Sequence, residues 1–197
     1  MPLDTQGYFN ALRASLNTSF YEIHPKDGKV LLKEKVFTSG PNKKEFKVDL
    51  HYSGEVIAIK LDKVLNSSPQ PLFHFLDDNS KPWSKRCDFV IFNLISNKIK
   101  VYCIEFKSGS IPIDTHDQLK ASLGWCKALH ATIKSYTGES KKLTLTKFVF
   151  SECANAAAYT DVHGYLNRDH TVKHYLYSDL VGFSLSDLIN TNTEQIK

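Results

Sequence analysis

The chain has 197 residues, of which 42% are hydrophobic and 23% charged, a composition typical of a folded domain with a sizeable core. Its net charge of +4 is compatible with a polyanionic partner without requiring one. Four cysteines without a CxxC spacing disfavour a disulfide framework or a zinc site and indicate a reducing compartment. The N-terminus has no signal-peptide pattern and no apolar run is long enough to cross a membrane, so we expect a cytoplasmic protein with no membrane partner.

Apolar periodicity and turn residues predict an alternation of helices and strands along the chain. Strands are predicted at Phe46–Tyr52, Glu55–Leu61, Phe89–Ile95, Ile99–Phe106, Leu143–Ser151 and Val172–Tyr177. Helices are predicted from Asp4 to about Asn17, from Thr115 to about Ser135, and as a final turn at Ser184–Ile189. Loops are predicted at Asn66–Pro71, Asp77–Lys85, Ser108–Ile113 and, with a short helix, Asn155–Asn167.

Three details of this pattern predict how the elements pack. Ser53-Gly54 separates the first two strands, which predicts a hairpin. The long helix presents a buried stripe of Leu119, Leu123, Cys126 and Ile133. The element order predicts one α/β domain over residues 1–197 with a mixed central β-sheet flanked by helices. Its core is expected at about 46–177, with an N-terminal helix and extension at 1–45 and a frayed tail at 190–197.

The segment from Arg86 to Gly109 contains the most informative polar residues, because they border two strongly apolar runs. A two-residue turn at Ser96-Asn97 would pair the two runs as a hairpin and place Asp88 opposite Glu105. A turn at Asn97-Lys98 would instead place Asp88 opposite Lys107 on the same face. A three-residue loop would oppose Asp88 to Phe106 and separate the charged groups.

Two opposed carboxylates repel one another, so one pKa should rise unless a cation lies between them. Oxygen ligands suit Mg²⁺ or Mn²⁺, which would lower the pKa of a bound water and neutralise charge on a phosphate. Lys107 would stabilise developing negative charge or orient the attacking water. Asp88, Glu105 and Lys107 therefore predict metal-dependent phosphodiester hydrolysis, and the alternative is a structural ion pair at the end of the sheet.

Asp88 followed by the triplet Glu105-Phe106-Lys107 resembles the core of the PD-(D/E)xK nuclease superfamily. The resemblance covers roughly residues 86–130 and implies a restriction-endonuclease-like core of α-β-β-β-α-β order. It also implies that the backbone carbonyl of Phe106 is a metal ligand and that Gln118, at the start of the next helix, supports the site.

The chain departs from the superfamily pattern at three points. Cys87 stands where a proline often precedes the aspartate, and Ser122 occupies the tyrosine position of a Gln-x-x-x-Tyr motif. Many members also carry an upstream helical glutamate, for which Glu34, Glu45 and Glu55 are all candidates.

Basic and aromatic residues near this segment have two interpretations each. Lys120, Lys127 and Lys134 recur every seven residues as a stripe that is either a solvated helix face or a track for phosphates. Candidate nucleic-acid contacts are Lys85, Arg86, Ser108, Lys120 and Lys127. Trp83 and Trp125 either pack in the interior or stack on a base.

The sequence thus predicts a Mg²⁺- or Mn²⁺-dependent nuclease, with DNA the favoured substrate and endonuclease favoured over exonuclease. Repair, restriction or phage defence are settings that the resemblance implies, and a homodimer or a protein partner is compatible with so small a chain. The rival hypothesis is a non-catalytic module that keeps the nuclease fold and binds nucleic acid or protein through its basic surface.

Overall fold

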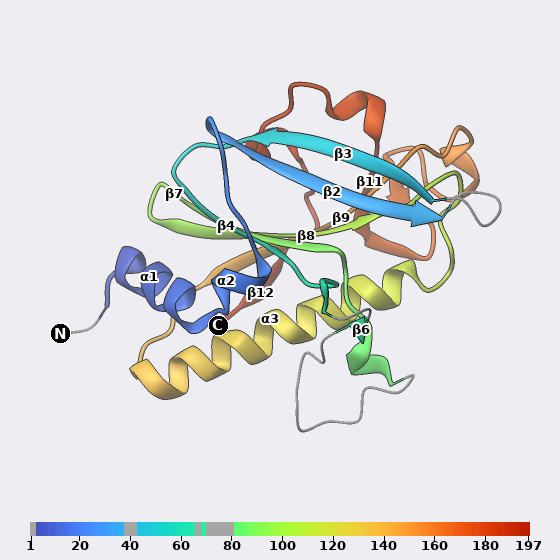
Figure 1. Ribbon diagram of the computed structural model, residues 1–197. Coiled ribbons are helices and arrows are strands. Elements are labelled where there is room, and N and C mark those ends of the chain that lie inside the picture. The colour runs from blue at the N-terminus through green and yellow to red at the C-terminus, as the bar shows by residue number, and fades with distance from the viewer. Residues whose placement is uncertain (1–2, 38–42, 66–67, 70–80) are drawn as a thin grey trace.

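A mixed β-sheet organises the molecule, which we describe from a computed structural model covering residues 3–37, 43–65, 68–69 and 81–197 (Figure 1). Within these residues the sheet has eight strands. In spatial order it contains β1 (Glu22–Ile23), β4 (Glu55–Lys60), β7 (Phe89–Ile95), β8 (Lys98–Phe106), β9 (Leu143–Ser151), β11 (Asp169–Leu176) and β10 (Tyr165–Leu166), with β12 (Glu194–Ile196) paired to β9. The β8–β9 and β9–β11 pairs are parallel and the others antiparallel, so the predicted α/β architecture with a mixed central sheet is confirmed.

The helices cover one face of this sheet (Figure 1). They are α1 (Thr5–Ser15), the short α2 (Thr18–Tyr21) and the long α3 (Thr115–Thr137). Asp4 caps α1 by accepting a hydrogen bond from the backbone N–H of Gly7 at 2.7 Å. The predicted buried stripe of α3 is confirmed, since its four residues join the core between the helices and the sheet. Helix α3 also supplies the crossover that the parallel strands β8 and β9 require.

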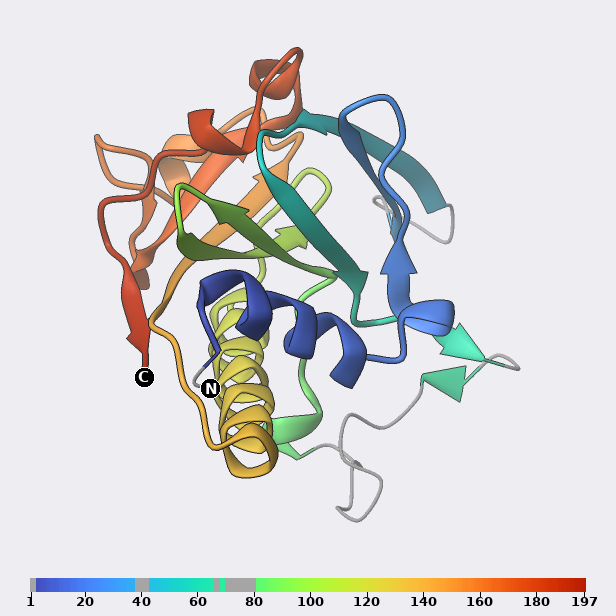
Figure 2. The ribbon, with the colours of Figure 1, turned by 90° about the vertical axis from the view of Figure 1, so that its left-hand side faces the viewer.

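The opposite face is covered by a two-stranded antiparallel ribbon of β2 (Lys29–Phe37) and β3 (Lys43–His51), which lies above the sheet in Figure 1 and at the upper right in Figure 2. Val30, Leu32 and Leu50 of this ribbon are fully buried in a second core against the sheet. The predicted flanking helices therefore lie on one face of the sheet, and a β-ribbon covers the other. The core also begins well before residue 46, because part of the predicted N-terminal extension forms β2.

The predicted hairpin at Ser53-Gly54 is wrong as a pairing, although the turn is present. Gly54 has φ +78°, but β3 pairs with β2, while β4 joins β7 in the central sheet. Burial explains the separation: β3 alternates exposed and buried residues, whereas β4 is buried on both faces. An amphipathic strand suits the outer ribbon and an apolar strand suits the middle of a covered sheet.

The remaining elements are short, and they include one further correction. The predicted frayed tail forms β12, whose Ile196 is buried in the helical-side core. Separate from the sheet are the small ribbon of β5 (Val64–Leu65) and β6 (Ser68–Pro69) and the 3-10 turns η1 (Pro82–Ser84), η2 (Ala156–Ala158), η3 (Tyr177–Leu180) and η4 (Leu185–Asp187). The predicted loops 66–71 and 77–85 lie partly outside the described residues. No helix in the described part of the chain has the length and apolar character needed to cross a membrane.

Candidate active site

The hairpin of β7 and β8 has the register that places the key residues together. Ser96 and Asn97 form its two-residue turn with φ of 49° and 58°, the left-handed conformation of a type I′ turn. Ile95 therefore faces Lys98, and Phe89 faces Ile104 at the far end. One step further along, Asp88 lies opposite Glu105, as the Ser96-Asn97 turn predicts.

The side chains of Asp88 and Glu105 both accept hydrogen bonds from the backbone of the neighbouring strand. The N–H of Asp88 donates to Glu105 Oε2 at 3.2 Å, and the N–H of Phe106 donates to Asp88 Oδ2 at 2.6 Å. Both carboxylates are buried, with 8% and 2% of the residue exposed. Two carboxylates are thus held side by side in a position that is costly for charge.

Lys107 and Gln118 complete the predicted set at the same end of the sheet, where β7 begins and β8 ends, which we call the edge of the site. The ammonium group of Lys107 donates to Glu105 Oε1 at 2.6 Å and to Gln118 Oε1 at 2.9 Å. Gln118 lies in the first turn of α3, so the helix that follows the hairpin holds the lysine in place. The four predicted catalytic residues Asp88, Glu105, Lys107 and Gln118 are therefore brought together in the structure.

Two hydroxyl groups support the backbone on either side of this cluster. Ser122 is fully buried, accepts a hydrogen bond from the N–H of Cys87 at 2.7 Å and donates to the Gln118 carbonyl at 2.8 Å. The hydroxyl of Tyr177 donates to the Lys107 carbonyl at 3.0 Å. The small residue at position 122 thus ties α3 to the segment that carries Asp88.

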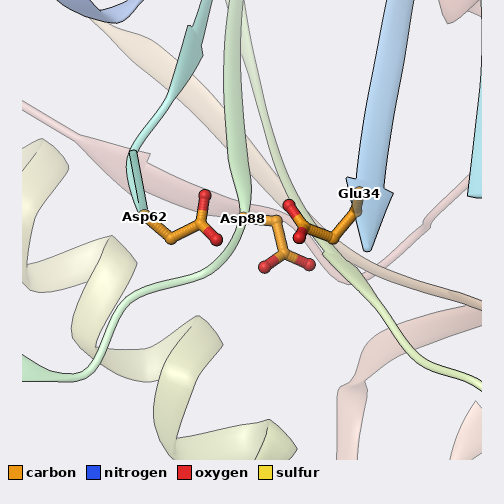
Figure 3. A group of neighbouring side chains, drawn as sticks. All are labelled: Glu34, Asp62 and Asp88. Atoms are coloured by element: carbon orange, nitrogen blue, oxygen red, sulfur yellow. The ribbon is translucent and has the colours of Figure 1, made fainter. Parts of the chain in front are cut away.

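Two further carboxylates reach Asp88 from other parts of the chain (Figure 3). Glu34 projects from β2 of the covering ribbon, and Asp62 follows the end of β4. Carboxylate oxygens of these three residues lie within 4.8 Å of one another. Asp62 is brought close because the β4–β7 ladder continues one step, with the N–H of Leu61 donating to the Asp88 carbonyl at 2.9 Å.

Lys60, at the end of β4, is the second cation of this edge. Its ammonium group forms an ion pair with Glu34 and lies 3.6 Å from Asp62 Oδ1. Burial disfavours its charge, but the neighbouring carboxylates of Glu34, Asp62 and Asp88 outweigh burial and raise the pKa of Lys60.

Asp88, Glu105 and Asp62 hold their protons more tightly than carboxyl groups in water do. Burial, and then the charge of Glu105, raises the pKa of Asp88 well above its ordinary value. Burial raises the pKa of Glu105 to about 7 although Lys107 acts in the opposite direction. Burial and the charge of Glu34 raise the pKa of Asp62 to about 6. Among the described residues, the Oδ1 atom of Asp62 is buried and has no hydrogen-bond partner.

These properties suit a divalent cation. The charged side chains connected by these contacts are Glu34, Asp62, Asp88, Glu105, Lys60 and Lys107. Within this described set, when all six are ionised, four carboxylates face two ammonium groups, so the set itself carries two more negative than positive charges. Oxygen ligands with this surplus are those that Mg²⁺ or Mn²⁺ prefers.

The backbone of Phe106 is oriented toward the same side. The N–H of Lys107 donates to the Phe150 carbonyl on β9 at 2.8 Å. Because a trans peptide directs its C=O opposite to its N–H, the Phe106 carbonyl points away from β9, toward Asp88. The implied ligand carbonyl is therefore on the side of the carboxylates.

Of the candidate nucleic-acid residues, Lys85, Arg86 and Ser108 lie within three residues of Asp88 or Lys107 along the chain. Lys85 forms an ion pair with Asp117 of α3 at 2.8 Å, and Arg86 Nε donates to the Ser84 carbonyl at 3.1 Å. Ser108 directly follows Lys107. Lys120 and Lys127 are exposed on α3, as both interpretations of the lysine stripe require.

Sequence reasoning missed Asp62, Lys60, Ser122 and Tyr177 as members of this site. Of the three candidates for an upstream glutamate, Glu34 is near the site, but it lies on a strand rather than a helix. Glu45 pairs with Lys47, and Glu55 is exposed at the other end of β4. The signal in the sequence for Lys60 and Asp62 was the charged run Lys60-Leu61-Asp62 at the end of the apolar β4. To place this run near Asp88, one had to know that β4 pairs with β7.

Comparisons of the chain with models of known protein families, with curated proteins and with solved structures give no match.

Proposed function

We propose that the protein is a Mg²⁺- or Mn²⁺-dependent nuclease that hydrolyses phosphodiester bonds, with DNA as the favoured substrate. The observation that carries the proposal is the arrangement of Asp88, Glu105, Lys107 and Gln118 at one sheet edge, with the lysine held between a buried carboxylate and an amide. Perturbed carboxyl groups beside a positioned lysine are typical of functional sites.

The order of elements supports the same reading. Six of the elements, α1, β4, β7, β8, α3 and β9, occur along the chain in the α-β-β-β-α-β order that the resemblance implies. Between α1 and β4 stand α2, β1, β2 and β3, and between β4 and β7 stand β5, β6 and η1. The hairpin β7–β8 carries Asp88 and the Glu-x-Lys triplet, and β8 and β9 are parallel across α3. The covering ribbon of β2 and β3 is an addition to that order.

The residues present fit a metal ion, which would be held by Asp88, Glu105 and the Phe106 carbonyl, with Glu34 and Asp62 adding negative charge. Bound there, a divalent ion supplies a more acidic water and neutralises charge on the phosphate. Lys107 orients the attacking water or stabilises the charge that develops on the phosphate oxygens. Gln118 keeps the ammonium group directed at this position.

A non-catalytic binding module is the second candidate, because the basic stripe of α3 would serve it equally well. Such a module has no use for a buried carboxylate cluster with surplus negative charge, since it repels phosphates and is costly to bury. The cluster therefore favours the enzyme.

Cleavage of supercoiled plasmid and of single-stranded DNA, with Mg²⁺, Mn²⁺ or EDTA, tests the proposal. We expect metal-dependent cutting by the native chain and at least a hundredfold loss in Lys107→Met, because removal of one charge-stabilising group typically costs about 10²–10³-fold. Asp62→Asn should raise the metal concentration needed for half-maximal cutting. Lys98→Met is the matched control, since it removes an exposed lysine at the turn end of the β7–β8 hairpin, the end opposite to Asp88.

Folded protein that cuts neither substrate with either metal would argue against the enzyme. Equal cutting by the native chain and Lys107→Met would instead place the activity elsewhere or in a contaminant.

A further inference from the structure

A groove beside the candidate active site has a composition suited to an unpaired nucleic-acid strand. It has a volume of about 650 Å³ and lies between η1 and the first half of α3. Its lining includes Trp83, Lys85, Asp117, Lys120, Gly124 and Trp125. This volume falls within the roughly 300–1,000 Å³ of typical ligand sites. We call this feature the tryptophan groove.

Both tryptophans of the chain line the groove. Trp83 is 42% exposed, an unusual position for so large an apolar side chain. Trp125 is half-buried and packs with one side against the helical-side core. Two indole rings therefore border one cavity, and indole faces are the surfaces on which unpaired bases stack.

One residue of the groove lining is a glycine. Gly124 is exposed within α3, and a Cβ added there would meet no atom within 4 Å. Packing therefore does not require glycine, although glycine inside a helix costs about 0.5–1 kcal/mol relative to alanine. Gly124 lines the groove, so the lining at this position is helix backbone without a side chain.

The rim of the groove carries positive charge and leads to the carboxylate cluster. Lys85 and the exposed Lys120 offer two ammonium groups against the single carboxylate of Asp117, which is paired with Lys85. Asp117 directly precedes Gln118, and Lys85 lies three residues before Asp88. A chain with phosphates at the lysines would extend from the groove toward Lys107.

From this juxtaposition we infer that the tryptophan groove binds unpaired nucleotides, with bases stacked on Trp83 and Trp125 and phosphates near Lys85 and Lys120. The inference deepens the proposed nuclease function and rests on it for the direction of the strand. A single strand is favoured over a duplex because the faces of paired bases are covered by their neighbours and cannot reach an indole.

Intrinsic fluorescence tests the groove directly, because its two tryptophans are the only ones in the chain. Oligothymidylate and oligouridylate of about 12 nucleotides, a length within the known site sizes of single-strand binders, are titrated in EDTA so that binding is measured without cutting. A duplex of the same length is the comparison, and anisotropy of a labelled oligonucleotide measures binding wherever it occurs. We expect saturable quenching by one or both single strands and weaker quenching by the duplex, and the preferred oligonucleotide assigns DNA or RNA.

Variants separate stacking from general attraction. Trp83→Leu should weaken single-strand binding at least about fivefold, the loss of one stacked base, whereas Trp83→Phe should retain part of the affinity. Lys120→Gln should lower the salt dependence of binding by close to one phosphate contact. Lys98→Gln, at the exposed turn of the β7–β8 hairpin, should leave it nearly unchanged. Gly124→Leu places a side chain in the groove while both tryptophans stay in place, so it is a second variant that should weaken single-strand binding.

Anisotropy that reports binding while tryptophan emission stays constant would place nucleic acid elsewhere and overturn the inference, without affecting the cleavage test. No binding by either measure would also overturn it and assign the groove to another partner, such as a protein segment. Quenching that persists in Lys107→Met but is lost in Trp83→Leu supports the groove independently of catalysis.

Discussion

Replacing Glu105 with glutamine tests whether the carboxylate cluster exists for function or for stability. A structural ion pair predicts that removing one buried partner destabilises the fold by about 3–5 kcal/mol. A site built for a metal predicts the opposite at neutral pH without metal, because the buried charge is itself a liability. Glutamine keeps the shape and the acceptor oxygen of the side chain but cannot ionise.

The magnitude follows from the pKa of Glu105, which burial raises from 4.5 to about 7 even after the opposing effect of Lys107. A carboxyl whose pKa is higher folded than unfolded binds more protons in the folded state. Its contribution to stability is therefore full below about pH 4.5 and is lost as the pH rises through about 7. At about 1.4 kcal/mol per tenfold change in proton affinity, the loss is on the order of 3 kcal/mol.

Glu105→Gln should thus match the native chain at about pH 4.5 and exceed its stability by up to about 3 kcal/mol at about pH 8. The measurement is urea unfolding in EDTA at both pH values, repeated with Mg²⁺. Metal at about 100 times its dissociation constant should stabilise the native chain by about 2.7 kcal/mol and leave the variant unchanged.

The matched control is Glu152→Gln, which removes a carboxylate paired with Lys44 at the surface and should change stability by less than about 1 kcal/mol. If Glu105→Gln proves less stable than the native chain at about pH 8 in EDTA, the cluster is a structural ion pair and the reasoning is refuted.

Two further predictions concern pH and the fold. Mg²⁺ affinity, measured by calorimetry, should rise with pH through the range of about 6 to about 7, because over this range Asp62 gains its negative charge beside the ion and Glu105 loses the proton that blocks a ligand oxygen; a flat profile would exclude Glu105 as a ligand. Gly54→Ala should destabilise the fold by at least about 1–2 kcal/mol in thermal unfolding, because its φ of +78° disfavours a side chain and the new Cβ would lie 2.1 Å from the Leu94 carbonyl oxygen. Unchanged stability would mean that this turn is not built as described.

The sequence alone determined the elements whose partners are close along the chain. A two-residue turn at Ser96-Asn97 fixes the register of its hairpin, so the pairing of Asp88 with Glu105 could be counted from the turn outward. Alternation along β8 then placed Lys107 on the same face as Glu105, and helical spacing identified the buried side of α3. These are local rules, and they do not depend on the rest of the fold.

Only the tertiary structure decided which distant segments meet at this edge. Glu34 reaches Asp88 because the ribbon of β2 and β3 covers the sheet face, and Asp62 does so because β4 pairs with β7 rather than with β3. The final residues became β12 because the sheet offered the free edge of β9 beside a core that Ile196 could enter. A strand's pattern records how many of its faces are buried, whereas its neighbour is selected by competition among all segments for the same buried surface. Hence the hairpin half of the candidate site could be predicted from sequence, and the half contributed by β2 and β4 could not.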